Sequence, residues 1–379
     1  MIIIVMNNII PIYIPNIDKY KKSAIKAIND GWISNHGEYI KKSNQKLSEI
    51  LNVPYVILMS NGTCATHCLF LSLKFKYPNI KKIYVSNNCF VAAWNCMFKE
   101  YKDFEIMRMD IDTWNIDTSK EEILKIDKNS CVFIIHNVGN IINVPRLKKI
   151  RPDLIFIEDN CEGFLGKYEN SYSGCSKDIL CSSVSFYGNK TLTTGEGGAF
   201  FTHHKYIYDY IKSVYSQGMT EIKYLHDKIA YNYRMTNIQA AFLYDQLNDL
   251  ENILKKKKEI FDNYKRLLRD LIEKKKIIFF KQEEYTLNTN WIFTLRILNN
   301  PFSIEETNKF FKDNKIDIRP FFYPIDRHKH FDFIKNTDLN SYILNKEIIF
   351  IPSYPELKIE KQIYIVKIIN KFINLICII

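Results

Sequence analysis

Short apolar runs separated by helix-like stretches dominate the chain up to residue 202, and this alternation constrains the fold more than any other feature. The runs are 55–59, 82–86, 104–109, 131–136, 154–158, 182–186 and 198–202. Strands that alternate with helices form a mainly parallel sheet covered by helices on both faces. The sequence therefore predicts an α/β fold with a mainly parallel seven-stranded sheet between helices. Ligands of such sheets bind at the carboxyl ends of the strands.

The pattern changes in the second half of the chain. Residues 236–275 form a long amphipathic helical stretch, which we expect to connect two domains. Beyond residue 277 the sequence predicts a small C-terminal α+β domain. Its predicted elements are a strand at 290–297, helices at 303–314 and 358–376, and a proline-containing loop at 319–324. We place the large domain at 1–250 and the small domain at 251–379. The large domain begins with two predicted helices, at 18–30 and 38–51.

Composition and charge exclude several classes of protein. A hydrophobic content of 46% is too high for a mainly disordered chain. The net charge of +11 is spread along the chain, and the densest run, Lys255–Lys258, lies in a helical pattern. We interpret that run as a solvated helix face and expect no nucleic-acid partner. A positive balance suits an anionic small substrate equally well.

The nine cysteines show no spacing of metal ligands, which predicts reduced thiols and no metal site. The apolar run Met1–Val5 is too short for a signal peptide core or a membrane span. We therefore expect a soluble cytoplasmic protein without a membrane partner.

Two charged residues are the main candidates for chemistry. Lys190 lies between the predicted strand 182–186 and the glycine cluster 195–198, and Asp159 follows the strand 154–158. A pyridoxal phosphate (PLP) enzyme needs such a pair, because the lysine links to the cofactor aldehyde and the acid keeps the pyridine nitrogen protonated. Taken singly, each has an ordinary explanation: a surface lysine, and an aspartate that caps a helix or pairs with a protein cation.

A second group of residues could hold the rest of such a cofactor. Small residues after the first strand leave N–H groups at a helix N-terminus free for a phosphate, so we expect Gly62, Thr63 and Cys64 to bind it, although many turns contain Gly and Thr. Phe90 is a candidate lid for one face of the ring, although most phenylalanines are core residues. Glu162 is a candidate for the cofactor's 3-hydroxyl side, with helix capping as the alternative.

In this order the motifs resemble those of the PLP-dependent nucleotide-sugar aminotransferases, which have the aspartate aminotransferase fold (PLP-transferase fold type I). The resemblance extends from about residue 10 to at least residue 330. The matching motifs are Gly31-Trp32-Ile33-Ser34, Asn61-Gly62-Thr63, Asp159 with Glu162, Ser185 to Lys190 with Gly195–Gly198, and Asn232-Tyr233-Arg234-Met235. The chain departs from the family pattern at Ser43-Asn44, at Asn61 and at Asn160-Cys161. None of these departures removes a catalytic group.

The resemblance implies a homodimer with a shared active site. Asn232 is expected to reach the phosphate of the partner's cofactor, and Ser185 to bind that phosphate from its own chain. Lys190 is implied as the catalytic lysine. The residues implied to contact the substrate are Trp32, Ile33, Ser34, Lys190, Arg319 and Tyr323.

The resemblance also implies a reaction. The expected reaction moves an amino group from glutamate to the C4 keto group of a nucleotide-linked 4-keto-6-deoxyhexose, as in enzymes that make viosamine- or perosamine-type sugars. UDP- or dTDP-4-keto-6-deoxyglucose is the expected type of substrate, and the sequence does not separate these nucleotides from GDP.

Three alternatives stay open beside this reaction. One is transfer to a 3-keto sugar. Another is a sugar dehydratase, against which Lys190 argues because those relatives carry histidine at its position. The last is a non-catalytic regulatory protein on the same scaffold, which should have lost Asp159, Ser185 or Lys190.

Overall fold

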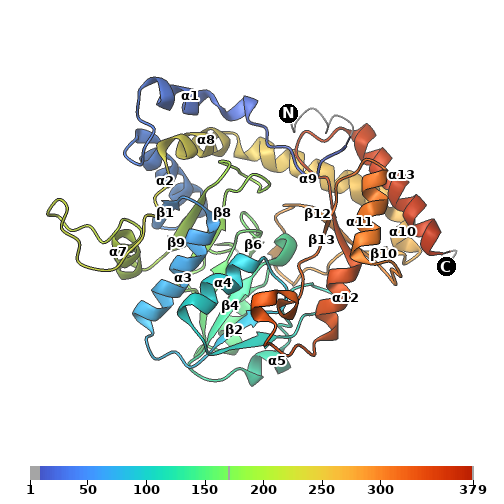
Figure 1. Ribbon diagram of the computed structural model, residues 1–379, viewed down its shortest axis with the longest axis horizontal. Helices are drawn as coiled ribbons and strands as arrows, with labels where there is room; N and C mark the ends of the chain where they lie inside the picture. Colours follow the sequence, from blue (N-terminus) through green and yellow to red (C-terminus); the bar gives the residue numbers. More distant parts are fainter. Residues whose placement is uncertain (1–8, 170, 378–379) are drawn as a thin grey trace.

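The computed structural model describes residues 9–169 and 171–377, so the run Met1–Val5 lies outside the described residues. Within them the chain forms a seven-stranded sheet flanked by helices, with a second sheet beside it (Figure 1). The strand order is β1 (Tyr55–Met59), β9 (Gly198–Thr202), β8 (Ser182–Ser185), β5 (Ile155–Asp159), β4 (Cys131–Ile135), β2 (Ile83–Ser86) and β3 (Phe104–Met107). Only β9 is antiparallel to its neighbours in this sheet. The predicted mainly parallel seven-stranded sheet is confirmed.

Strand side chains alternate between two buried faces. Ile57 and Phe133 face a core shared with α3 (Gly62–Lys76), α4 (Val91–Glu100) and α7 (Lys205–Val214). Val56 and Leu58 face the opposite side, where helices α1 (Lys22–Asn29), α2 (Glu38–Leu51) and α8 (Asn237–Asn248) pack. Helices α5 (Lys120–Lys125) and α6 (Val144–Ile150) contribute to a core beside Val132 and Ile134 on that same side. Most strands of the central sheet are therefore buried on both faces, whereas the edge strand β3 is only partly covered.

The second sheet is antiparallel and lies toward the C-terminus. Its order is β10 (Ile277–Ile278), β12 (Phe293–Ile297), β14 (Ile348–Ile351) and β13 (Arg319–Pro320). The helices of this part are α9 (Leu250–Leu267), α10 (Arg269–Glu273), α11 (Ile304–Asp313), α12 (Leu339–Glu347) and α13 (Ile359–Ile376). A third, small sheet of β11 (Thr286–Leu287), β6 (Lys167–Tyr168) and β7 (Ser171–Tyr172) joins the two halves of the chain.

The helical stretch expected at 236–275 is divided into α8, α9 and α10. Asp249 and Leu268, which separate these helices, have backbone angles outside the helical range. We propose that the domain boundary predicted near residue 250 lies at the first of these breaks. Helix α8 and the first turn of α9 pack on the large sheet, whereas α9 from Ile260 onward packs in the C-terminal core.

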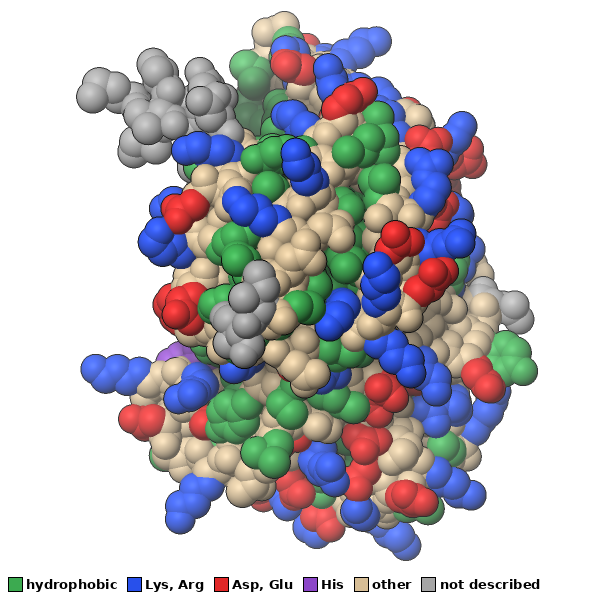
Figure 2. Space-filling model, turned by 90° about the vertical axis from the view of Figure 1, so that its right-hand side faces the viewer, with side chains coloured by type: hydrophobic (Ala, Val, Ile, Leu, Met, Phe, Trp, Pro, Cys, Tyr) green, Lys and Arg blue, Asp and Glu red, His purple; other side chains and the backbone are tan. Residues whose placement is uncertain are grey.

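Charged side chains are scattered over the molecular surface. On the face shown in Figure 2, lysine and arginine side chains lie among acidic and apolar ones. Many of them form pairs at helical spacing, such as Lys258 with Asp262 and Lys309 with Asp313. No helix within the described residues combines the length and the apolar character that crossing a membrane requires.

One lysine of the run Lys255–Lys258 departs from the predicted solvated face. Lys257 is buried in α9, and its Nζ donates hydrogen bonds to the carbonyl oxygens of Trp291 and, over 3.1 Å, Ser353. Burial lowers the pKa of this amine to about 7, because the apolar surroundings disfavour the charged form. Helical periodicity brings this one residue inward, beside Ile260 and Phe261 of the core.

The depressed pKa of Lys257 predicts a pH-dependent stability. Between about pH 7 and pH 10 the unfolded chain binds one more proton than the folded chain, so the free energy of unfolding should rise with pH, by at most about 1.4 kcal/mol per pH unit. Lys257→Met should lack this contribution, whereas Lys255→Met, at an exposed position of the same helix, should retain it. Urea unfolding of the three proteins at about pH 7 and pH 9.5 measures the difference. Identical pH dependence in wild type and Lys257→Met would contradict the assignment.

Candidate active site

Lys190 lies in the turn that follows β8, beyond the carboxyl end of that strand. Its backbone N–H donates to the carbonyl of Tyr187 over 2.9 Å, and its own carbonyl accepts a 3.0 Å hydrogen bond from the hydroxyl of Tyr13. The amine itself lies 4.1 Å from the centre of the Trp291 ring. Within the described part of the chain, Lys190 forms no ion pair with a carboxylate.

Asp159 ends β5, which pairs directly with β8, the strand that precedes the Lys190 turn. One carboxyl oxygen accepts a hydrogen bond from Thr66 Oγ1 at 3.3 Å, and the other accepts the N–H of Cys161 at 2.9 Å. No lysine or arginine of the described residues pairs with it, so the salt bridge considered as its alternative role is absent there. The carboxylate can therefore receive a cationic N–H from a ligand.

The turn from β1 into α3 contacts the end of β8. A Cβ atom added at Gly62 would lie 2.7 Å from the Cβ of Ser185, so only glycine allows these two segments to approach so closely. Asn61 caps α3 by accepting the N–H of Cys64 at 2.9 Å. The N–H groups of Gly62 and Thr63 precede the helical hydrogen-bond pattern and remain available to an anion.

Two more predicted phosphate residues are Cys64, in the first turn of α3, and Ser185, at the end of β8. Burial raises the pKa of the Cys64 thiol, so it stays protonated, and Ser60 donates its hydroxyl to the sulfur at 3.4 Å. The hydroxyl oxygen of Ser185 accepts the N–H of Tyr187 at 3.2 Å, which leaves the hydroxyl proton free to donate. The predicted phosphate residues Gly62, Thr63, Cys64 and Ser185 thus lie together.

Two further candidates lie at neighbouring strand ends. Phe90 precedes α4 and is 60% exposed, which is unusual for a phenylalanine and excludes the core role considered for it. Glu162 is buried, and its Oε2 accepts the N–H of Val138 at 2.8 Å. Burial raises the pKa of Glu162 to about 7, and the positive charge of Lys190 opposes that rise.

Val138 has a backbone conformation that β-branched residues rarely adopt, with φ of 54°. This left-handed turn aims the Val138 N–H at Glu162. Backbone strain of this kind is concentrated at functional sites. Neither Val138 nor Thr66 carries a sequence signal of its role.

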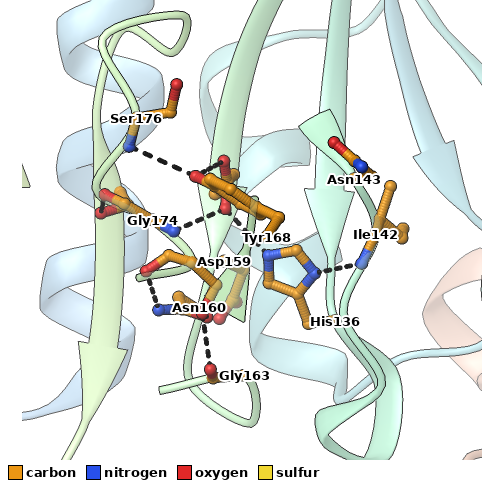
Figure 3. Close-up of polar contacts among 12 residues, drawn as sticks. His136, Ile142, Asn143, Asp159, Asn160, Gly163, Tyr168, Gly174 and Ser176 are labelled. Carbon is orange, nitrogen blue, oxygen red and sulfur yellow. Dashed lines mark hydrogen bonds and ion pairs between the residues drawn. The ribbon is translucent and has the colours of Figure 1, made fainter. Parts of the chain in front are cut away.

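His136, at the end of β4, is directed into a buried network instead of the open strand edge (Figure 3). Its Nδ1 accepts the N–H of Ile142 at 3.1 Å, so its Nε2 carries the proton and donates to Glu158 at 2.8 Å. Glu158 also accepts the hydroxyl of Tyr168 at 2.9 Å and the N–H of Gly174 at 2.8 Å. The side chains of His136 and Glu158 are both fully buried. This network holds the end of β5, which carries Asp159, and the loop after it, which carries Glu162.

Asn232 does not contact Lys190 or Ser185 of its own chain among the hydrogen bonds of the described residues. Its side-chain oxygen accepts a 2.9 Å bond from Arg234, at the base of an arm that spans residues 216–232 and lies beyond α7 in Figure 1. The arm is closed by bridges between Ser216 and Asn232 and between Met219 and His226. Its exposed apolar residues are Met219, Ile222, Tyr224, Leu225 and Ile229.

Apart from Lys190, the predicted substrate residues lie in two separate segments, the loop after α1 and the segment 319–323. Trp32 and Ile33 are exposed in the loop after α1, and Asn237 fixes that loop by donating to the carbonyls of Trp32 and Ser34 at 2.6 and 2.7 Å. Tyr323 lies in a loop attached to the end of β2, where Asn88 donates to Phe322 at 2.8 Å.

The Tyr323 loop is close to Phe90, because the Phe90 and Phe322 rings lie edge to face with centres 6.4 Å apart. Arg319, at the start of this segment, is exposed and pairs with Asp317. The structure therefore brings Tyr323 close to Phe90 and leaves Arg319 in β13, at the edge of the second sheet.

Comparison with known proteins agrees with this arrangement. The model of the DegT/DnrJ/EryC1/StrS aminotransferase family matches residues 15–370. The chain is 31% identical over 367 residues to GDP-perosamine synthase of Escherichia coli O157:H7, covering 96% of this chain and 98% of that protein. It is 28% identical over 382 residues to GDP-perosamine synthase of Vibrio cholerae, covering 97% of this chain and all of that protein (100%).

Among solved structures, E. coli GDP-4-keto-6-deoxy-D-mannose-3-dehydratase with bound hydrated PLP superposes with a TM-score of 0.84 at 19% identity. That alignment covers 94% of this chain and 98% of the other. The predicted fold is thus confirmed by a PLP-containing neighbour. With a family match across nearly the whole length, the chain belongs to the DegT/DnrJ/EryC1/StrS aminotransferase family and is a PLP-dependent sugar aminotransferase.

Proposed function

We propose that this enzyme transfers an amino group from glutamate to the C4 keto group of a GDP-linked 4-keto-6-deoxyhexose. The observation that carries the proposal is the amine of Lys190, without a carboxylate partner in the described residues, at the same sheet edge as Asp159 and the Gly62–Ser185 contact. The choice of GDP over the UDP or dTDP expected from the sequence rests on full-length similarity to two GDP-perosamine synthases.

The chemistry of the residues at the strand ends fits PLP. Asp159 has no cationic partner of its own in the described residues and suits the protonated ring nitrogen. The α3 N-terminus and the Ser185 hydroxyl suit a phosphate, and the close approach at Gly62 keeps that cradle open. Phe90 offers an exposed ring face for stacking.

Bound PLP supplies an electron sink for the bond broken at the α-carbon of the amino donor. Lys190 is the group that can hold the cofactor covalently and, when released, move a proton at that α-carbon. Asp159 keeps the ring nitrogen protonated throughout. Glu162, whose carboxyl group accepts the Val138 N–H, would lie on the 3-hydroxyl side of the bound ring.

A nucleotide panel tests the substrate. Purified enzyme with PLP and glutamate is offered GDP-, UDP- and dTDP-linked 4-keto-6-deoxyhexoses, and products are identified by mass spectrometry and NMR. We expect a C4 amine on the GDP sugar, at a rate at least about tenfold above the other nucleotides. A product from the UDP or dTDP sugar alone, or an amine at C3, would reject the proposal. Loss of a hydroxyl without an added amine would indicate dehydratase chemistry, as in the structural neighbour.

The Gly62 contact makes a separate prediction about cofactor affinity. Gly62→Ala should force the α3 turn away from Ser185 and weaken PLP binding by about tenfold or more, because the phosphate contacts depend on this spacing. Gly188→Ala is the matched control, since its added Cβ would meet no atom within 4 Å. PLP titration of the apoproteins followed by absorbance measures both. Equal affinities in the two variants, with both folded by circular dichroism, would remove Gly62 from the cofactor site.

We further propose that the enzyme is a homodimer in which Asn232 completes the partner's site. The support is the position of Asn232 at the base of an arm that presents exposed Tyr224 and Ile229, 79% and 95% exposed. Exposed apolar side chains gathered on one projection are typical of an interface.

Subunit mixing tests this arrangement. Lys190→Ala and Asn232→Ala homodimers should each be impaired, and a denatured and refolded equal mixture should regain about one quarter of wild-type activity, because each heterodimer carries one intact site. Sedimentation velocity confirms the dimer in every sample. A mixture no more active than the average of the two homodimers would contradict a shared site.

A further inference from the structure

The indole ring of Trp291 lies against the amine of Lys190. The ring centre is 4.1 Å from Nζ, and Trp291 is 4% exposed. Within the described residues, Lys190 is the one lysine that lies over a tryptophan ring; the other lysine contacts of this kind involve tyrosine or phenylalanine. Tryptophan has the aromatic face that attracts an ammonium group most strongly.

Trp291 is fixed on both its side chain and its backbone. Its indole Nε1 donates a 2.9 Å hydrogen bond to the carbonyl of Asn189, the residue before Lys190. Its backbone N–H donates to Thr289 Oγ1 at 3.0 Å, and its carbonyl accepts from the buried Lys257. The two backbone bonds fix the position of the residue, and the indole ring cannot turn away from Lys190 without breaking its hydrogen bond to Asn189.

The loop that carries Trp291 also reaches the other site residues. Thr289 donates from its hydroxyl to the carbonyl of Glu162 at 3.2 Å and from its N–H to the carbonyl of Gly139 at 3.2 Å. The segment before β12 therefore connects the C-terminal sheet to the strand-end loops. Trp291 lies where this connection meets the Lys190 turn.

A lysine that is alternately bound to a cofactor and released needs a defined place when it is free. A long, flexible side chain loses rotamer freedom each time it is brought back to the reacting atoms. A ring face beside the amine limits that freedom without a carboxylate, which would hold the ammonium more tightly. Glu162 is within electrostatic range of Lys190 but already receives the Val138 N–H.

We propose that Trp291 is a positioning residue whose indole face holds the Lys190 ammonium whenever that lysine is not joined to the cofactor. The proposal rests on the proposed function of Lys190 as the cofactor lysine. Trp291 touches the lysine and is assigned no contact with the substrate. Its indole hydrogen bond to Asn189 holds the ring centre 4.1 Å from the amine.

The test uses the full-length apoprotein and an amine-acylating reagent at trace concentration. Peptide mass spectrometry gives the labelling rate of Lys190 relative to Lys102, which lies over Phe98 and serves as an internal standard. Trp291→Leu should increase the relative rate for Lys190 by about threefold or more, because the amine loses its ring. Trp291→Phe keeps a ring face, so its relative labelling rate at Lys190 should lie between those of the wild type and Trp291→Leu. Trp94 is a buried tryptophan whose indole N–H donates to the carbonyl of Ser86, and it serves as the control. Trp94→Phe should label Lys190 at the wild-type relative rate.

A second measurement covers the possibility that Trp291→Leu does not fold. Biosynthetic replacement of tryptophan by fluorinated tryptophans preserves shape but withdraws electron density from the ring face. Lys190 labelling should then rise stepwise with fluorine content while Lys102 labelling stays constant. A constant Lys190 rate across the fluorinated series, or in folded Trp291→Leu, would overturn the proposal.

Turnover separates this inference from the proposed function. In Trp291→Leu, kcat should fall about tenfold with the KM for the nucleotide sugar unchanged, and Trp291→Phe should recover part of the loss. A wild-type enzyme that does not aminate the GDP sugar would reject the proposed substrate and leave the labelling result standing. A rise in KM with unchanged kcat would make Trp291 a substrate contact and contradict its positioning role.

Discussion

The strand-end site depends on the hydrogen bonds that satisfy the fully buried carboxylate of Glu158. A buried carboxylate is costly unless every oxygen is paired, and here the ring of His136, the hydroxyl of Tyr168 and the N–H of Gly174 supply the partners. These partners come from the residue after β4, from β6 and from the loop after β7, so the network ties three segments to the end of β5. Asp159, the next residue, then extends from a fixed backbone. The network itself needs no part in the chemistry.

The site is completed by parts of the chain that the central sheet does not contain. Tyr13 bonds the Lys190 carbonyl from the N-terminal segment, and Trp291 contacts the amine from the loop before β12. Lys257 supports Trp291 from α9 without an ion pair in the described residues. The large sheet therefore supplies the candidate cofactor groups, and the C-terminal part fixes how the lysine is presented to them.

Much of this arrangement could be predicted because it follows from local pattern. Strand alternation located all seven strands of the large sheet. The rule that ligands bind at carboxyl ends predicts a common site for Gly62, Phe90, Asp159 and Lys190, and the structure has these residues at or just after the ends of β1, β2, β5 and β8. Trp291 could not be found this way, since it lies about a hundred residues from Lys190 and in no motif. The burial of His136 and Lys257 was also not predictable from the sequence. Their positions in a predicted strand and a predicted helix did not show that these polar side chains point inward.

The measurement that tests the account most directly is the identity of the lysine joined to PLP. Enzyme incubated with PLP is reduced with borohydride, digested and mapped by mass spectrometry, so that the linked lysine keeps the cofactor mass. We expect the label on Lys190. Lys257, a second buried lysine whose pKa is lowered to about 7, is the competing candidate within the chain. A label on Lys257, or on any lysine other than Lys190, would contradict the assignment of the active site.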